Sequence, residues 1–376
     1  MMKTLFFLGH PAHFHLFKNV IKQLEPEGHE VEILIKKKDI LEDLLAHSSV
    51  EYNNILPHGR SDGKLGILTG LIKKNIGLYK HCKVNRPDLM LGTSAEIAHI
   101  GKLLGIPSVV FSEDDVSVIK SFATITYPFT NHIMSPDVCE NGRWNSKTIF
   151  YSGYHKLAYL HPNYFNPDYR VLQKYSVPKK SFVLLRFAKL TAHHDDGITG
   201  ITDEIAEKLI DLLTKHGNVY ISSERELPLK FEPYRLKIDP LDIHHFLAYA
   251  KLFIGDSQSM AVEAAMLGTP SIRFSSFAGR ISVLEELEHK YKLTYGIKPD
   301  NPEELYTVVD KLLATPNLRD LHEARKQKML SDKIDVTAFL KWFITNYPSS
   351  SQVITEEPAY QKRFMDKNLQ VKTEED

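Results

Sequence analysis

Small polar residues follow an apolar run late in the chain, in the stretch GDSQSMAVEAAMLGTP at residues 255–270. This pattern predicts a buried strand, a polar turn and then a helix. The first N–H groups of a helix lack intrahelical partners and carry the positive end of its dipole, so they suit a diphosphate. Glu263 lies one turn along, where a carboxylate can accept hydrogen bonds from a ribose. The alternative is a purely structural helix cap. The residues of the turn are Asp256, Ser257, Gln258 and Ser259.

Three histidines follow the first apolar run, in GHPAHFHLFKN at residues 9–19. Gly9 allows a ligand to approach the backbone closely, and a neutral histidine can take a proton from a hydroxyl nucleophile. The spacing of the histidines is not that of a common structural zinc site, and no cysteine or carboxylate nearby completes one. We therefore predict no metal. The alternative is that the histidines only pack or cap the loop.

Two further charged stretches each follow an apolar run. In RFAKLTAHHDDG at 186–197, the cations Arg186 and Lys189 can neutralise a phosphate and His193 can hydrogen-bond it, although a solvated hairpin is the alternative. In SEDD at 112–115, adjacent carboxylates raise one another's pKa, so that Glu113 or a neighbour can act as an acid or base. Exposed loop acids without a role are the alternative.

These stretches must be positioned by strands that alternate with helices. Strand-like and helix-like segments alternate over the first ninety residues, and the pattern restarts after a loop-rich region at 155–180. Two successive α/β halves are the simplest architecture, and ligands of such sheets bind at the carboxyl ends of the strands. We expect domains at 1–165 and 166–335, a terminal helix at 336–347 that crosses back to the first domain, and a polar, poorly ordered tail at 348–376.

Composition excludes several classes of protein. The 376 residues contain 47 Lys and Arg and 47 Asp and Glu, so the net charge is zero and no nucleic-acid partner is expected. Two distant cysteines form no disulfide framework, which favours a cytoplasmic setting. No apolar run is long enough to span a membrane, so membrane contact would be peripheral. The lysine-rich helix expected at 64–83 can lie on an anionic membrane, although packing against its own sheet is the commoner role.

Dehydrogenase, P-loop and α/β-hydrolase functions lack support, because their glycine-rich or nucleophile motifs are absent. The stretch GHPAHFHLFKNVIKQLEPEGHEV instead resembles the first loop and helix of GT-B glycosyltransferases. GDSQSMAVEAAMLGTPSIRF resembles the nucleotide-sugar segment shared by those transferases and UDP-N-acetylglucosamine 2-epimerases. Residues 1–345, with GYHKLAYLHP at 153–162, also resemble an uncharacterised family related to both.

The resemblance implies a GT-B architecture, in which two Rossmann-like domains with parallel sheets face an interdomain cleft. It places His13 where many transferases carry their catalytic base. It also places the diphosphate at residues 257–259 and the ribose of UDP at Glu263. The chain departs from the epimerase pattern at Thr93, where epimerases have an aspartate, and ITYPFTNHIM at 125–134 replaces further acids. Glu113 still matches one epimerase acid.

We therefore predict a metal-independent glycosyltransferase, with His13 and Glu113 as candidate catalytic residues, that acts in glycan or cell-envelope polysaccharide synthesis without a cofactor. Its expected partners are a donor, in the first place a UDP-sugar, and a sugar or lipid-linked acceptor. A homodimer and contact with the inner face of the membrane remain open. The alternatives are a 2-epimerase-like enzyme and a non-catalytic nucleotide-sugar-binding protein.

Overall fold

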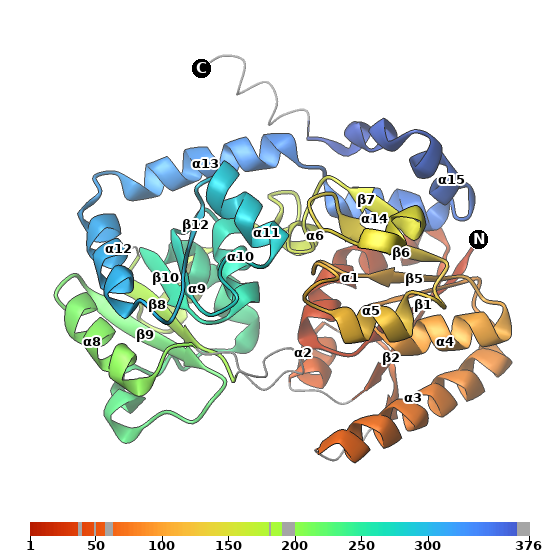
Figure 1. Ribbon diagram of the computed structural model, residues 1–376, viewed down its shortest axis with the longest axis horizontal. Helices are drawn as coiled ribbons and strands as arrows, with labels where there is room; N and C mark the ends of the chain where they lie inside the picture. The colour runs from red at the N-terminus through yellow and green to blue at the C-terminus, as the bar shows by residue number, and fades with distance from the viewer. Residues whose placement is uncertain (37–39, 49, 57–62, 180–181, 190–199, 367–376) are drawn as a thin grey trace. The chain divides into compact units, whose positions relative to one another are not determined.

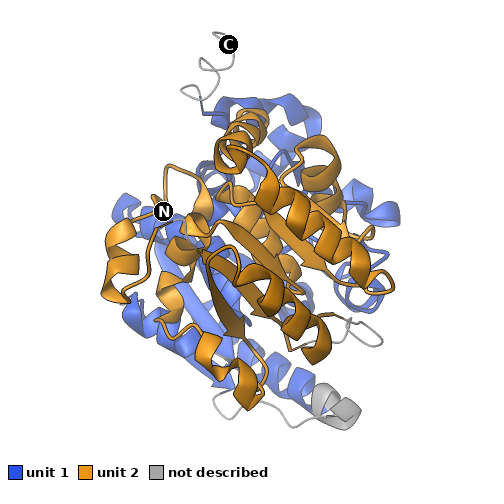
Figure 2. Cartoon of the chain, turned by 90° about the vertical axis from the view of Figure 1, so that its left-hand side faces the viewer, with its two compact units in different colours: residues 1–159, 333–366 blue, residues 160–332, 367–376 orange. Residues whose placement is uncertain are grey.

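Two parallel sheets organise the chain in a computed structural model, which describes residues 1–36, 40–48, 50–56, 63–179, 182–189 and 200–366 (Figure 1). Unit 1 contains residues 1–159 and 333–366, and unit 2 contains 160–332 (Figure 2). The boundaries therefore fall a few residues before those expected at 165 and 335. The chain re-enters unit 1 at residue 333, where the N–H of Ile334 donates a hydrogen bond to Ser152 O at 2.8 Å.

The sheet of unit 1 has seven parallel strands in the order β3-β2-β1-β4-β5-β6-β7. Leu5 to Leu8 of the first strand are fully buried, because helices cover both faces of the sheet. The strands are β1 (Lys3–Leu8), β2 (Glu30–Lys36), β3 (Asn53–Leu56), β4 (Leu89–Gly92), β5 (Ser108–Phe111), β6 (His132–Pro136) and β7 (Thr148–Tyr151).

Two layers of helices pack on this sheet. One layer contains α3, α4 and α5, with α4 next to both of the others. Its core includes Leu78, Ile97 and Ala123 from these helices and Leu5 and Phe7 from β1. Helix α1 packs beside α14. The helices of unit 1 are α1 (Pro11–Leu24), α2 (Leu41–His47), α3 (Gly63–Asn85), α4 (Ala95–Leu104), α5 (Lys120–Thr126), α14 (Val336–Thr345) and α15 (Ser349–Glu356), and α6 (Leu157–Leu160) begins in it.

The sheet of unit 2 has five parallel strands in the order β12-β11-β10-β8-β9. Its strands are β8 (Phe182–Phe187), β9 (Asn218–Ser223), β10 (Leu252–Gly255), β11 (Ser271–Phe274) and β12 (Thr294–Ile297). Its helices are α7 (Tyr169–Lys174), α8 (Asp203–Leu213), α9 (Ile243–Tyr249), α10 (Gln258–Met266), α11 (Ser282–Glu285), α12 (Pro302–Ala314) and α13 (Leu318–Asp332), and a π-helical turn η5 (Glu286–Lys290) follows α11.

Two local expectations differ from the structure. Helix α1 begins at Pro11, so His13 lies in its first turn rather than in a loop before it. Proline suits this position because its fixed φ is helical and its missing N–H has no intrahelical acceptor. In place of a tail without structure from 348, the chain forms α15 and the 3-10 segment η6 (Pro358–Phe364). The apolar residue Ile354 is buried there, and Gln361 accepts a hydrogen bond from Ser152 N at 2.7 Å.

In the part of the chain that the structure describes, each helix is either too short or too polar to cross a bilayer.

His322 on α13 gives unit 2 a sensitivity to acid. Burial lowers its pKa to about 3, and the nearby Arg325 and Arg319 contribute. Below pH 6.5 the unfolded chain takes up the proton first, so stability is lost as the pH falls. We expect His322→Gln to flatten the decline in unfolding free energy between pH 6.5 and 4 by about 1.4 kcal/mol per pH unit. Urea denaturation across this range measures the slope, and an unchanged slope would contradict the assignment.

Candidate functional site

The carboxyl edge of the unit 1 sheet gathers candidate residues at its topological switch point. Strand β1 lies between β2 and β4, and the later strands extend the sheet in opposite directions from this pair. Ligands of doubly wound sheets bind at such a point. Gly9 follows β1, Thr93 follows β4 and Glu113 follows β5. Adjacent parallel strands thus deliver these three residues to one edge.

His13 is held by two neighbours at this edge. The N–H of Gly9 donates to its Nδ1 at 3.0 Å, and the Thr93 hydroxyl lies 2.5 Å from its Nε2 and 2.9 Å from its Nδ1. Because Nδ1 accepts from the backbone, the neutral ring carries its proton on Nε2, which donates to Thr93. Gly9 and His13 were expected together and are in contact. The space beside Gly9 is narrow, since a Cβ there would lie 3.0 Å from Cε of Lys36.

The surroundings of His13 keep its ring neutral. Burial lowers its pKa well below the ordinary value of 6.5, and the positive charges of His10, Lys36 and His155 lower it further. Among the described residues, no carboxylate lies within ion-pair distance of the ring. His13 is therefore neutral at neutral pH, its one basic nitrogen, Nδ1, accepts the Gly9 N–H, and it lacks the carboxylate partner that would strengthen it as a base.

Glu113 is nearly buried and is held as an anion. Its Oε1 accepts the N–H of His155 at 2.7 Å, and its Oε2 forms an ion pair with Lys156. Burial alone would raise the pKa of Glu113, but the positive charge of Lys156, the proximity of His155 and the hydrogen bonds from both residues outweigh this effect and lower it. The expectation of an acid whose pKa is raised by adjacent carboxylates is therefore wrong for Glu113. An ionised carboxylate can accept protons or hydrogen bonds but cannot act as an acid at neutral pH.

His155, in the segment that follows β7, lies beside Glu113. Its ring stacks on Tyr151 with an interplanar angle of 8°, and its Nδ1 lies 3.9 Å from Oε2 of Glu113. Burial lowers its pKa to about 4. Its Nε2 is buried without a hydrogen-bond partner among the described residues. Sequence reasoning did not assign His155 or Lys156 to the site, although both lie in GYHKLAYLHP, a stretch that the family resemblance includes.

In unit 2 the corresponding switch point lies between β8 and β10, since β9 extends the sheet on one side and β11 and β12 on the other. Asp256 follows β10 there and is buried. Its Oδ1 accepts the N–H of Ala188 at 2.6 Å, and its Oδ2 accepts that of Ile201 at 3.2 Å. Only glycine fits at position 200, where a Cβ would lie 2.6 Å from Oδ2. Asp256 therefore anchors backbone segments beyond β8, and burial raises its pKa.

The amino end of α10 carries both a cap and accessible polar groups. The Ser257 hydroxyl accepts the N–H of Met260 at 3.4 Å, which is the capping role weighed from the sequence. Ser259 is exposed in the first turn. The amide of Gln258 donates to Asp256 O at 3.3 Å, whereas its Oε1 is buried without a partner among the described residues. The cap uses one N–H group and leaves the end of the helix suited to an anion.

Arg186 and Lys189 are placed differently from each other. The Arg186 guanidinium donates to the Ser222 hydroxyl at 2.6 Å and pairs with Glu224, so protein groups already neutralise it. Lys189 is exposed, and its N–H donates to Glu224 at 3.2 Å. Among the described residues of this basic loop, Lys189 is the one whose charge is accessible to a phosphate. His193 lies outside the described residues.

Glu263 lies on α10 but is largely buried rather than exposed. Its Oε1 is 3.5 Å from Nε2 of His244, a buried histidine on α9 that sequence reasoning did not single out. A ribose can contact Glu263 only if one oxygen of its carboxylate is accessible to the ligand beside α9. The role of Glu263 stays a prediction.

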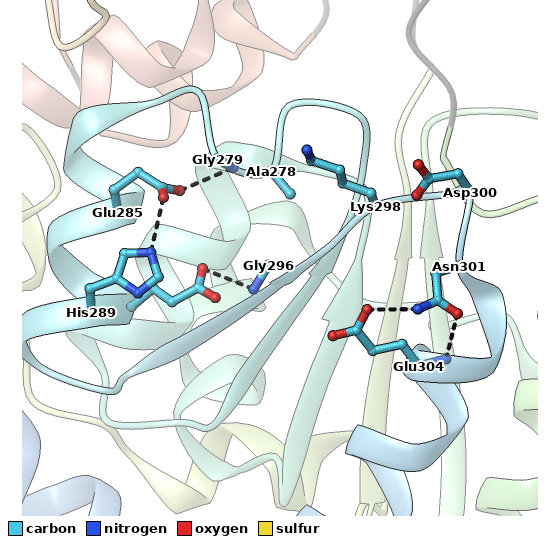
Figure 3. Close-up of a pocket in the computed structure, with 10 residues that line it drawn as sticks. Ala278, Gly279, Glu285, His289, Gly296, Lys298, Asp300, Asn301 and Glu304 are labelled. Atoms are coloured by element: carbon cyan, nitrogen blue, oxygen red, sulfur yellow. Dashed lines mark hydrogen bonds and ion pairs between the residues drawn. The ribbon is translucent and has the colours of Figure 1, made fainter.

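A cavity of about 570 Å³ opens at the same edge of unit 2, beyond β11 and β12 (Figure 3). Glu285 accepts the Gly279 N–H at 3.1 Å and lies 3.1 Å from His289, and these groups form part of one wall. Lys298, Asp300 and Glu304 also line the cavity. None of the residues predicted from the sequence lines it. Among the described residues, no cluster of three or more His, Cys, Asp or Glu side chains is arranged to hold a metal ion.

The sequence of this chain matches one described protein family. The family described as "Protein of unknown function (DUF354)" matches residues 4–338. The chain belongs to this family. None of the curated proteins matches its sequence.

Solved structures share the fold of this family member at low identity. A structure of S. aureus MnaA with UDP is 14% identical, with a TM-score of 0.66, and covers 93% of this chain and 98% of its own. UDP-GlcNAc 2-epimerase from Methanocaldococcus jannaschii is 13% identical, with a TM-score of 0.60 and coverages of 86% and 98%. The spinosyn rhamnosyltransferase SpnG, bound to spinosyn aglycone, is 13% identical, with a TM-score of 0.55 and coverages of 91% and 100%. The predicted α/β fold of GT-B type is confirmed.

Proposed function

We propose that this protein is an enzyme that acts on a nucleoside diphosphate sugar and binds the diphosphate at the amino end of α10. The observation that carries the proposal is the junction of β10 and α10 at the switch point of unit 2, with Ser259 exposed beside it. Helix N–H groups and dipole favour an anion there. The exposed Lys189 after β8 adds a positive charge at the same edge. Fold likeness to structures containing UDP or UDP-GlcNAc supports this choice of ligand.

For the reaction, the first candidate is an epimerisation of the UDP-N-acetylglucosamine 2-epimerase kind. Three of the similar structures are named as such epimerases and a fourth contains UDP, which favours this alternative over the transferase expected from the sequence. Glu113, held as an anion after β5, is the carboxylate available in unit 1 to remove or return a proton. Thr93 argues against an epimerase, because it stands where the epimerase pattern has an aspartate.

The second candidate is transfer of the sugar to an acceptor hydroxyl. His13 favours it, because a neutral imidazole at the switch point of unit 1 can accept a hydroxyl proton without a metal once the Gly9 N–H releases Nδ1. The neighbouring Thr93 hydroxyl lies 2.5 Å from Nε2 of the ring and helps to orient it. Likeness to the spinosyn rhamnosyltransferase supports this candidate.

Ligand binding tests the shared part of the proposal. We expect UDP and one UDP-sugar to raise the thermal midpoint, with about 2.7 kcal/mol of added stability at a hundredfold excess over Kd. Glu263→Gln should weaken UDP binding about tenfold or more, because a charge-assisted hydrogen bond contributes roughly 1.5–3 kcal/mol. Glu303→Gln on the exposed side of α12 is the matched control. If UDP-, GDP-, CMP- and dTDP-sugars all leave the midpoint unchanged, the proposal fails.

The two reactions are separated by incubation with the stabilising sugar nucleotide alone in deuterium oxide. An epimerase exchanges a carbon-bound proton of the sugar for deuterium and needs no acceptor. A transferase leaves that carbon unlabelled and turns over only when an acceptor hydroxyl is added. Mass spectrometry of the recovered sugar distinguishes them.

A further inference from the structure

Exposed apolar side chains gather on one helical layer of unit 1. Nine large apolar side chains of the described residues are exposed, and six of them belong to α3, α4 and α5 or to the residues just after α5. These helices are neighbours, with α4 beside both α3 and α5 (Figure 1). The six are Ile72, Ile76 and Val84 on α3, Leu103 on α4, Ile125 on α5 and Phe129. We call this set the apolar patch.

The exposed residues of α3 form a single face. Ile72, Ile76 and Val84 are 50%, 50% and 82% exposed, whereas Leu78 and Cys82 on the opposite side are buried in the core beneath. Their spacings of four and eight residues keep them on one side of the helix. The sheet side of α3 packs in its own core, whereas the outward apolar side chains remain half or more exposed to solvent. Packing against the sheet therefore accounts for the buried face of α3 but not for the apolar residues on its outward face.

The same layer is strongly cationic. The segments of α3 and α5 contain no Asp or Glu, and α4 contains Glu96 alone. Glu96 is buried and forms an ion pair with Lys74, so no acid of the three helices is exposed. The exposed lysines of the layer are Lys73, Lys80 and Lys83 on α3, Lys102 on α4 and Lys120 on α5. A chain whose net charge is zero thus concentrates positive charge where its apolar side chains are exposed.

We propose that this face of unit 1 binds the surface of an anionic lipid bilayer. Isoleucine, leucine and phenylalanine side chains enter the boundary between headgroups and acyl chains, and the lysines contact lipid phosphates. Lysine suits this role because its apolar stem lies along the hydrocarbon boundary while its ammonium stays with the headgroups. The inference depends on the charge and exposure of the layer and not on the proposed reaction.

Sedimentation with lipid vesicles tests the proposal on the full chain. We expect binding to equimolar phosphatidylcholine and phosphatidylglycerol vesicles, little binding to pure phosphatidylcholine, and a decrease with added salt. Lys80→Glu with Lys83→Glu should weaken binding about 25-fold or more, since each lysine contributes about fivefold. Ile72→Ser with Ile76→Ser should weaken it at low salt as well.

Matched controls come from unit 2. Leu229→Ser removes an exposed apolar residue that does not belong to the patch, and Lys215→Glu reverses an exposed charge on unit 2. Both should bind vesicles like the unchanged protein, with all variants keeping the same thermal midpoint. Equal binding to both vesicle types, or equal losses in the controls, overturns the proposal. It is also overturned if the isoleucine variant dissociates a dimer and vesicle binding is absent, because a second copy then covers the patch.

Discussion

His13→Ala is expected to lower turnover of the sugar nucleotide by about 10²- to 10⁴-fold, the usual contribution of a positioned acid or base. The ring lies at the switch point of unit 1, oriented by the Gly9 N–H at 3.0 Å and the Thr93 hydroxyl at 2.5 Å. Steady-state kinetics with the substrate identified by thermal shift measures the effect. UDP binding should change little, because we assign the diphosphate to α10 in unit 2.

His10→Asn is the matched control for His13. His10 caps α1 by accepting the Ala12 N–H on Nδ1 at 3.2 Å, and asparagine supplies a capping oxygen in place of that nitrogen while removing the imidazole. The pH profile adds a second readout. Since the pKa of His13 is well below 6.5, its neutral form persists as the pH falls through 6.5, and the unchanged enzyme should show no loss of activity there. If His13→Ala retains full activity, His13 does not take part in the reaction. The proposed diphosphate site at α10 would be unaffected by that result.

Arg273→Met is expected to lower the unfolding free energy of unit 2 by about 1–3 kcal/mol, because it leaves two partly exposed carboxylates without their hydrogen-bond donor. The Arg273 side chain on β11 is fully buried. Its Nη2 donates to Glu285 at 2.6 Å and to Glu288 at 3.0 Å. Without it, the two carboxylates lie close together with no cation between them. Urea denaturation measures the loss.

A second variant distinguishes stranded charge from lost packing. Adding Glu285→Gln and Glu288→Gln to Arg273→Met should recover part of the stability, since the remaining groups are then neutral. Arg280→Ala, at an exposed arginine in the following loop, should change the stability by less than about 0.5 kcal/mol. A loss below about 1 kcal/mol for Arg273→Met, or no recovery on neutralising the carboxylates, would contradict the assignment.

Much of the fold follows from local patterns in the sequence. Buried strands such as β1 and β10 are continuous apolar runs followed by small or polar residues, and the helices between them have an apolar face. The helix expected at 336–344 is found as α14, and Lys341 on it pairs with Glu27 at 2.6 Å, which ties it to the first domain. Helix boundaries were harder to predict. The proline that starts α1 could be taken for a loop residue, because proline is tolerated both in loops and in the first turn of a helix.

The candidate site was predictable as a set of strand ends but not as a set of contacts. The sequence places Gly9 and His13 together because they are neighbours along the chain. The contact of Thr93 with His13 joins residues 80 positions apart, and that of Glu113 with Lys156 joins residues 43 apart. Strand order decides such pairs, and no local pattern specifies it. Asp256 illustrates the same limit, since its carboxylate anchors backbone rather than facing a ligand.

The sequence by itself determined that this protein is an α/β chain with polar residues at the ends of its buried strands. Those features depend on residue type and spacing, which act within a few residues. Only the tertiary structure decided which strand ends are adjacent, that Lys156 lowers the pKa of Glu113, and that the lysines and apolar residues of α3 share an outward face with α4 and α5. Burial and charge pairing arise between segments far apart in the chain, so they exist only once the sheets have formed.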